Sequence, residues 1–300
     1  MTGAIKALSL AVKQDPTDAE GWYYLGLARN RQDDVKGARK ALENATKARY
    51  EFGPAHTAYA YSLLLSDRIA DAGREARIAL ELNAKDAEAH YVLGAVHLRQ
   101  SHAALAVREA ETAVQLKRSF PAAYLLKSQA LVAEYADRIE SEAKNRNSKI
   151  VYSPEERHRN SLKRAELFKQ AADALETYIN GIPREQGDTW REQLATLRVY
   201  STTGENAFSS TEVDSRVRVL KKPAPDYTSA ALNAGIAGTV ILRAVFSAQG
   251  TVEHILVLSY LPHGLTEASV AAARRIKFVP AMRDGKPVSM FMQLEYNFGF

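Results

Sequence analysis

The chain has 300 residues, of which 46% are hydrophobic, and its formal net charge is +5 at neutral pH, so it holds enough apolar material for two folded domains. The cations are dispersed rather than gathered in one stripe, which argues against nucleic-acid binding. No apolar run approaches the roughly 18 residues that a membrane-spanning helix needs. The absence of cysteine is typical of bacterial envelope proteins, although many cytosolic proteins also lack it.

Small residues recur every 34 residues through the first part of the chain. Two series of alanines carry this period, namely Ala4, Ala38, Ala72 and Ala106, and Ala11, Ala45, Ala79 and Ala113. Such a period is the signature of stacked helix-turn-helix units, which bury their apolar faces only against one another. We therefore expect residues 1–201 to form an all-α solenoid.

The residues that carry this period resemble those of the tetratricopeptide repeat (TPR) family. The matching positions are Trp22, Leu25, Gly26, Ala38, Leu42 and Ala45 in one unit, and Leu93, Gly94, Ala106 and Ala113 in another. In that register, Ala4 to Pro16 form the second helix of a unit whose first helix would precede Met1. We therefore expect a longer native protein whose membrane anchor lies upstream.

The fourth unit contains an insertion. It opens at Pro121, yet its second helix, marked by Ala171, comes 31 residues later than the period allows. Ser153 followed by Pro154 forms a helix start, with serine as the N-cap. We expect both helices to be longer by about four turns, at 3.6 residues per turn, forming a hairpin at about 135–170. Its basic surface is interpreted either as a solvated face or as a contact for an anionic partner.

The composition and the hydrophobic periodicity of the sequence change after residue 201. A polar segment over 202–220 is interpreted as a linker, and alternating hydrophobicity begins in a second domain over 221–300. The pattern predicts two helices, at 226–234 and 266–277, and three strands, at 239–246, 252–259 and 288–298. The last strand alternates between apolar and polar residues, which favours an antiparallel sheet with one face covered by helices. The fold class is therefore α+β and multidomain.

This second domain resembles the TonB carboxy-terminal domain family. The matching residues are Pro225, Tyr227, Gly235, Ile236, Gly238, Val240, Gly250, Val252, Val257, Ser259, Leu265, Ala272, Phe278, Pro280, Ala281, Gly285, Pro287, Val288, Tyr296 and Phe298. The chain departs from the family at Thr228, where the family commonly has proline after the tyrosine.

The resemblance implies binding rather than chemistry. In that family the domain docks in the periplasm against a segment of an outer-membrane transporter, which adds as a strand beside the final strand, and an inner-membrane proton-driven complex supplies force. An edge strand offers unpaired backbone groups to such a segment. The implied edge consists of Met290, Phe291, Met292, Gln293, Leu294, Glu295 and Tyr296. The alternative is that this strand is only the protected edge of a sheet.

The solenoid offers a second candidate binding site. In TPR modules the first helix of each unit lines a groove, which the register here assigns to Tyr23, Leu27, Tyr61, Leu65, Tyr91, Leu98 and Leu125. Tyrosines suit a peptide ligand because they offer a rigid contact area with a polar tip. The lysine and asparagine arrangement with which family members hold a terminal carboxylate is absent from the corresponding positions. The alternative is that the solenoid is a spacer or a self-association surface.

Catalytic motifs are not evident in the sequence. We found no phosphate-binding loop, nucleophile elbow or zinc-protease helix. His56 and His90 occupy the same packing position of successive units, 34 residues apart, and His97 lies seven residues after His90. No cysteine or carboxylate pair completes a metal site there. We therefore predict a protein that is not an enzyme and that has no metal or cofactor.

Two functional hypotheses remain open. In the first, the chain is the periplasmic part of a TonB-like energy transducer that is anchored in the inner membrane, with the solenoid as a stiff, protein-binding arm. In the second, it is an envelope scaffold whose TonB-like domain does not transduce force. The sequence upstream of Met1 would separate them, because a single membrane helix of transducer type favours the first hypothesis.

Overall fold

The computed structural model describes residues 2–147, 154–201, 207–208, 210 and 213–299. The chain divides into two compact units, Met1–Ala130 and Leu131–Phe300. The boundaries that the sequence suggests at residues 201 and 221 stay predictions.

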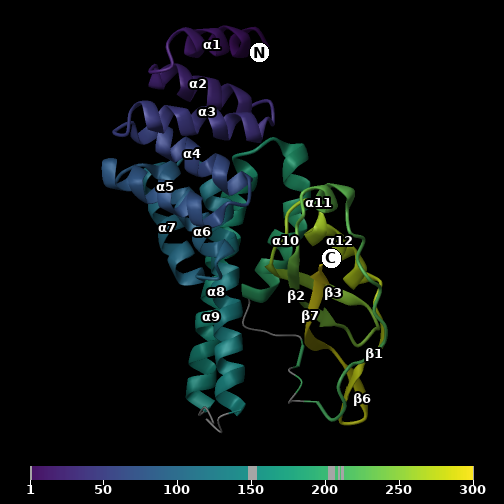
Figure 1. The fold of residues 1–300 in the computed structure, drawn as a ribbon. Helices are drawn as coiled ribbons and strands as arrows, with labels where there is room; N and C mark the ends of the chain where they lie inside the picture. Colours follow the sequence, from purple (N-terminus) through teal and green to yellow (C-terminus); the bar gives the residue numbers. More distant parts are fainter. Residues whose placement is uncertain (1, 148–153, 202–206, 209, 211–212, 300) are drawn as a thin grey trace. The chain divides into compact units, whose positions relative to one another are not determined.

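The first unit is built from pairs of short helices (Figure 1). They are α1 (Thr2–Gln14), α2 (Ala19–Asn30), α3 (Val35–Ala48), α4 (Gly53–Leu65), α5 (Ile69–Leu82), α6 (Ala87–Arg99) and α7 (Ala103–Leu116), followed by the start of α8. The periodic alanines of α3, α5 and α7 are fully buried, which lets the helices of each pair approach closely. The same cap recurs, since the carboxylates of Asp18, Asp34 and Asp86 accept hydrogen bonds from backbone N–H groups in the first turns of α2, α3 and α6.

Gly26 marks the closest helix–helix approach in the first repeat. A Cβ atom added there would lie 2.4 Å from Cγ of Leu42, which is fully buried in α3. Although alanine is the better helix former, we expect Gly26→Ala to lower the free energy of unfolding, because overpacking costs about 1–3 kcal/mol. Gly53→Ala is the control, since its added Cβ would meet Leu82 Cβ at an ordinary 3.6 Å. Equal denaturation midpoints for the two variants would contradict this packing.

Three further helices complete the array. The helices α8 (Pro121–Asn147) and α9 (Pro154–Asn180) have 27 residues each, about twice the length of those before them, and α10 (Arg184–Ser201) follows. Pro154 is the first residue of α9, while its expected N-cap, Ser153, lies outside the described residues, as do the side chains at the hairpin's tip. The described part of the chain thus has ten helices in a TPR-like array.

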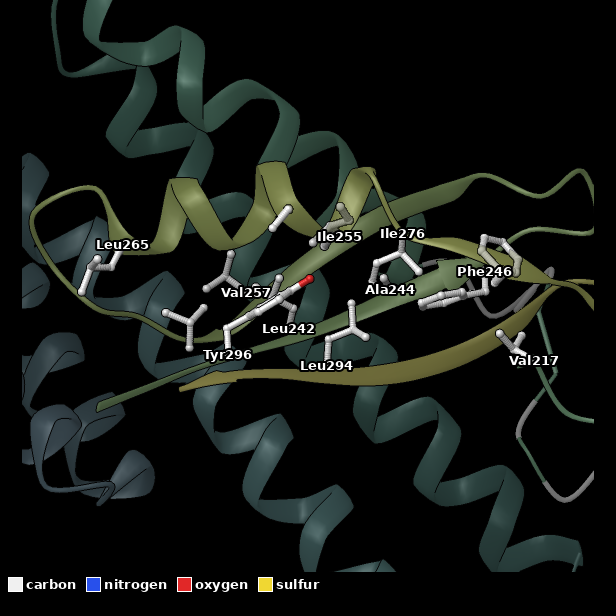
Figure 2. Close-up of a cluster of buried hydrophobic side chains, with 14 of the residues drawn as sticks. Val217, Leu242, Ala244, Phe246, Ile255, Val257, Leu265, Ile276, Leu294 and Tyr296 are labelled. Carbon is white, nitrogen blue, oxygen red and sulfur yellow. The ribbon is translucent and has the colours of Figure 1, made fainter. Parts of the chain in front are cut away.

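The rest of the second unit is an α+β domain. Its sheet is antiparallel, with the order β3 (Val252–Ser259), β2 (Gly238–Phe246) and β7 (Met290–Phe298). The helix α12 (Leu265–Arg274) covers one face, and Figure 2 shows the apolar side chains packed beneath it, among them Leu242, Val257 and Leu294. The short α11 (Ser229–Asn233) is capped by Thr228, whose hydroxyl accepts a hydrogen bond from the N–H of Ala231. The threonine at the family's proline position therefore starts this helix.

Four short strands were not predicted. They are β1 (Arg218–Lys221), β4 (Lys277–Val279), β5 (Ala281–Arg283) and β6 (Lys286–Val288), and they form the antiparallel pairs β1–β4 and β5–β6. The segment before β1, which the sequence interpretation assigns to a linker, also contacts the domain. Ser215 exchanges backbone hydrogen bonds with Met282, and Val217 is buried in the core.

Candidate functional site

The outer edge of β7 presents alternate backbone groups. The strand pairs with β2 without a register shift from Met290 to Phe298. The N–H of Phe291 donates to Phe208 rather than to β2, so it points away from the sheet. Since donors and acceptors alternate along an antiparallel strand, the N–H and C=O groups of Gln293, Glu295 and Asn297 point the same way. The outer edge therefore presents N–H and C=O groups at three alternate residues beyond Phe291.

The chain itself occupies two positions on this edge. The N–H of Phe208 donates to Ser289 O (2.8 Å), and its C=O accepts from Phe291 N–H (3.0 Å), which makes a one-residue parallel bridge. Further along, Lys222 Nζ donates to Glu295 O at 2.7 Å. Both N–H and C=O of Gln293, and the N–H of Glu295, have no partner among the described residues. The free stretch therefore begins at Gln293.

The predicted edge residues divide between two faces. Met290, Leu294 and Tyr296 are buried in the core, and Met292 packs against it. Gln293 and Glu295 are exposed, as the sequence analysis expects for their face. Phe291 is half-buried instead, because its ring lies 4.6 Å from the Arg243 guanidinium and 5.7 Å from the Tyr200 ring. All seven predicted residues lie on β7, and their role in binding stays a prediction.

Five side chains, which we call the Arg243 cluster, link β7 to the helices of the second unit. The rings of Tyr135 and Phe168 lie 4.3 Å apart, and those of Phe168 and Tyr200 lie 5.2 Å apart. The guanidinium of Arg243 lies between the rings of Phe291 and Tyr135, and its Cζ atom is 5.8 Å from the centre of the Tyr135 ring. Its Nε is buried without a hydrogen-bond partner among the described residues. The cation is therefore stabilised by aromatic faces.

The second face of the sheet is also covered, contrary to the expectation of one covered face. The helix α10 packs against β3, and the Tyr200 hydroxyl donates to His254 O at 3.2 Å. Leu256 and Leu258 are buried there, outside the core beneath α12. The continuous apolar run from Ile255 to Leu258 is the sequence signal for a strand buried on both faces, and the sequence analysis missed it.

The predicted groove residues of the array lie on first helices of the repeats. Tyr61 and Leu65 are exposed, and the others, Tyr23, Leu27, Tyr91, Leu98 and Leu125, are half-buried. The same two repeat positions are in contact in three successive repeats. The rings of Tyr23 and Phe52 lie 5.1 Å apart, the Thr57 hydroxyl donates to the Asp86 carboxylate at 2.7 Å, and the rings of Tyr91 and Phe120 lie 5.2 Å apart. Two of the tyrosines therefore also hold repeats together. The assignment of these residues to a ligand groove stays a prediction.

The histidines of the array are engaged in repeat packing. His56 Nδ1 lies 2.7 Å from Glu75, and His90 makes the same contact with Glu109 at 2.7 Å. His97 differs, because its Nδ1 is buried without a hydrogen-bond partner in the described part of the chain. Among the residues that the structure describes, no three potential metal-ligand side chains cluster.

A pH dependence follows from His97. Burial lowers the pKa of His97, against the opposing effect of Glu109, so the folded state binds the proton more weakly than the unfolded chain. Stability is therefore lost as the pH falls through the unfolded value of about 6.5. We expect His97→Leu to remove part of this loss when urea unfolding is compared between pH 7.5 and 5.5. A wild-type chain that is no more sensitive than the variant would contradict this expectation.

An array of helical repeats followed by a small domain with an open sheet edge defines a class of protein-interaction proteins. Residues 223–300 match the family model of the Gram-negative bacterial TonB protein C-terminal domain. The domain that carries the β7 edge is therefore TonB-like. This family belongs to the Gram-negative envelope, which is consistent with a periplasmic location.

The helical part is similar to several solved structures. They include MamA (19% identity, 63% of this chain and 91% of that chain, TM-score 0.42), TTC0263, a thermophilic TPR protein in Thermus thermophilus (13%, 65% and 89%, 0.45), and a monomeric mutant of IFIT1 with Gppp-AAAA (13%, 66% and 43%, 0.50). At these identities the likeness concerns the fold alone. No curated protein matches the chain.

The helical repeat array and the TonB-like domain both support a role in binding proteins or peptides. Within the described part of the chain, no helix combines the length and the apolar composition that a bilayer span requires.

Proposed function

We propose that the chain is a non-enzymatic periplasmic protein whose TonB-like domain binds an extended segment of an outer-membrane transporter. The segment adds as a strand beside β7, and the domain passes on force from an inner-membrane proton-driven complex. The repeat array acts as a protein-binding arm, and the native protein is anchored in the inner membrane. The observation that carries this proposal is the row of outward backbone groups at Gln293, Glu295 and Asn297.

The chemistry of the edge supports strand addition. The core face of β7 is fixed by buried Leu294 and Tyr296, so the strand is held in one register while its outer edge stays available. Gln293 and Glu295 are exposed beside that edge and would flank an incoming segment. Backbone pairing supplies affinity in this mode of recognition, and neighbouring side chains supply specificity.

Photo-crosslinking in the native cell tests the proposal. A photoreactive side chain at Gln293 should capture outer-membrane transporters through their amino-terminal segments, with partners identified by mass spectrometry. The matched control places the same group at Glu267, which is exposed on α12. Recovery of soluble envelope proteins alone, or equal recovery from both positions, would contradict transporter docking.

A proline substitution separates edge pairing from domain stability. Gln293→Pro removes an N–H group that points away from β2, so the domain should stay folded, as edge strands tolerate proline in this orientation. Crosslinking from a photoreactive group at Asn297 should then fall, because a lost hydrogen bond weakens binding by about threefold to tenfold. Leu294→Pro is the contrasting variant, since its N–H points toward β2 and its loss should unfold the sheet. Undiminished capture by Gln293→Pro would contradict pairing at this edge.

One observation favours the second hypothesis, an envelope scaffold without force transduction. Phe208 and Lys222 already bond to the β7 edge, which shortens the stretch available to a partner. In that case the array would recruit proteins and the β7 edge would stay closed. The same crosslinking experiment would then recover array partners only from positions on the array.

A further inference from the structure

The strands β1 and β4 form a small ribbon with one face turned away from the core. Phe278, in the middle of β4, is buried in the core, so its neighbours Lys277 and Val279 point outward. Arg218 is paired with Val279 and, after a register shift between Val219 and Lys221, Lys221 is paired with Lys277. Residues directly opposite each other share a face. The outward face of this ribbon therefore carries Arg218, Lys221, Lys277 and Val279.

This face concentrates positive charge without counterions. Lys221 lies directly across from Lys277, and like charges in that position destabilise a strand pair. Arg218 and Arg275 are also exposed, three residues before Lys221 and two residues before Lys277. Neither these two arginines nor the two lysines have an acidic partner in the described part of the chain. By contrast, Arg274 pairs with Glu192. The ribbon keeps a repulsive pair that an anionic ligand would relieve.

The same ribbon also exposes apolar surface and a free backbone edge. Leu220 is 58% exposed and Val219 and Val279 are each 38% exposed. Among the described strands, β1 pairs only with β4, so its other edge is open. An open edge suits an extended peptide, whereas a lipid surface would make no use of unpaired N–H and C=O groups. The combination of cations, apolar side chains and a strand edge fits a peptide in which acidic and apolar residues alternate.

We propose that the β1–β4 ribbon is a second docking surface, which binds an acidic, extended segment of a partner protein. The segment adds beside β1, with its carboxylates over Arg218, Lys221 and Lys277 and its alternate apolar side chains toward Val219. The strand β1, with Arg218 and Lys221, precedes residue 223, where the family match begins, whereas Lys277 and Val279 of β4 lie within the matched range. It is separate from the β7 edge and does not depend on the function proposed for that edge.

The test uses the whole chain and a fluorescent synthetic peptide of alternating glutamate and valine. Fluorescence anisotropy should show saturable binding that weakens as salt is raised. K221Q/K277Q should weaken binding by about tenfold, since two exposed charge pairs are lost. The matched control K36Q/K40Q removes two exposed lysines of α3 and should bind like the wild type. Removing the repulsive pair should leave the melting temperature of K221Q/K277Q unchanged or higher, which separates lost binding from unfolding.

Two further probes define the ligand. A peptide with lysine in place of glutamate should not bind, and a glutamate peptide with alternate backbone amides methylated should bind at least tenfold more weakly, because methylation blocks one strand edge. Undiminished binding of the methylated peptide would overturn strand addition. Unchanged affinity of K221Q/K277Q would overturn the ribbon as the site, as would binding only to vesicles that contain anionic lipid.

Discussion

Residues 213–300, produced without the helices α1 to α10, should be much less stable than the same domain in the whole chain and should self-associate. Leu256, Leu258 and Val245 are buried on the sheet face opposite α12, outside the core cluster beneath that helix. Since α10 packs against β3, the excised domain would expose Leu256 and Leu258, at a cost of about 2 kcal/mol each. Domains of this size are stable by about 5–15 kcal/mol, so the loss is a large fraction of the total. Urea unfolding and light scattering would measure both effects.

A double substitution makes this prediction specific. L256Q/L258T should raise the solubility of the excised domain, because it removes the exposed apolar face, and should destabilise the whole chain, because it places polar groups in a buried contact. Opposite signs in the two contexts are expected only if the helices cover this face. A soluble, monomeric excised domain with the stability of the whole chain would contradict the account.

Phe168→Ala should cost about 3–5 kcal/mol, the range for truncating a buried aromatic side chain. Phe168 is 2% exposed, and its ring contacts Tyr135 and Tyr200 in the Arg243 cluster. Its loss would leave a cavity and loosen the aromatic support of the Arg243 guanidinium. Because Tyr200 contacts Phe291 on β7, we also expect faster amide exchange along β3 and β7.

The matched control for this variant lies on the same helix. Leu162→Ala truncates a side chain of α9 that is exposed, so its effect should stay within about 0.5 kcal/mol. Chemical denaturation of both variants would check the difference. Similar midpoints for Phe168→Ala and the wild type would show that the Arg243 cluster does not hold the helices to the sheet.

Periodicity in the sequence was sufficient to predict the array and the main sheet. The alanines of α3, α5 and α7 at 34-residue spacing are buried because close contacts between helices require small side chains. The regular spacing of these small residues can be read directly from the sequence. The strand expected at 252–259 is the observed β3, while the last strand begins at Met290 rather than at residue 288. The helix expected from residue 226 begins only at Ser229, since Thr228 caps it.

Other features depend on tertiary contacts that no local pattern carries. Strand β1 has four residues, too few for a period, and its pairing with β4 joins segments far apart in the sequence. The bridge from Phe208 to β7 and the contact of Lys222 with Glu295 likewise arise only in the folded chain. The candidate edge at β7 was predicted by resemblance, but its shortening by these two contacts was not.

Amide hydrogen exchange along β7, followed by NMR, tests strand addition most directly. In the free chain, the N–H groups of Met292 and Leu294 should exchange slowly because they point toward β2, and those of Gln293 and Glu295 should exchange fast. Adding a peptide of the transporter segment recovered by crosslinking should protect Gln293 and Glu295 and leave Met292 and Leu294 unchanged. Protection of all four residues alike, or of none, would contradict the addition of a strand at this edge.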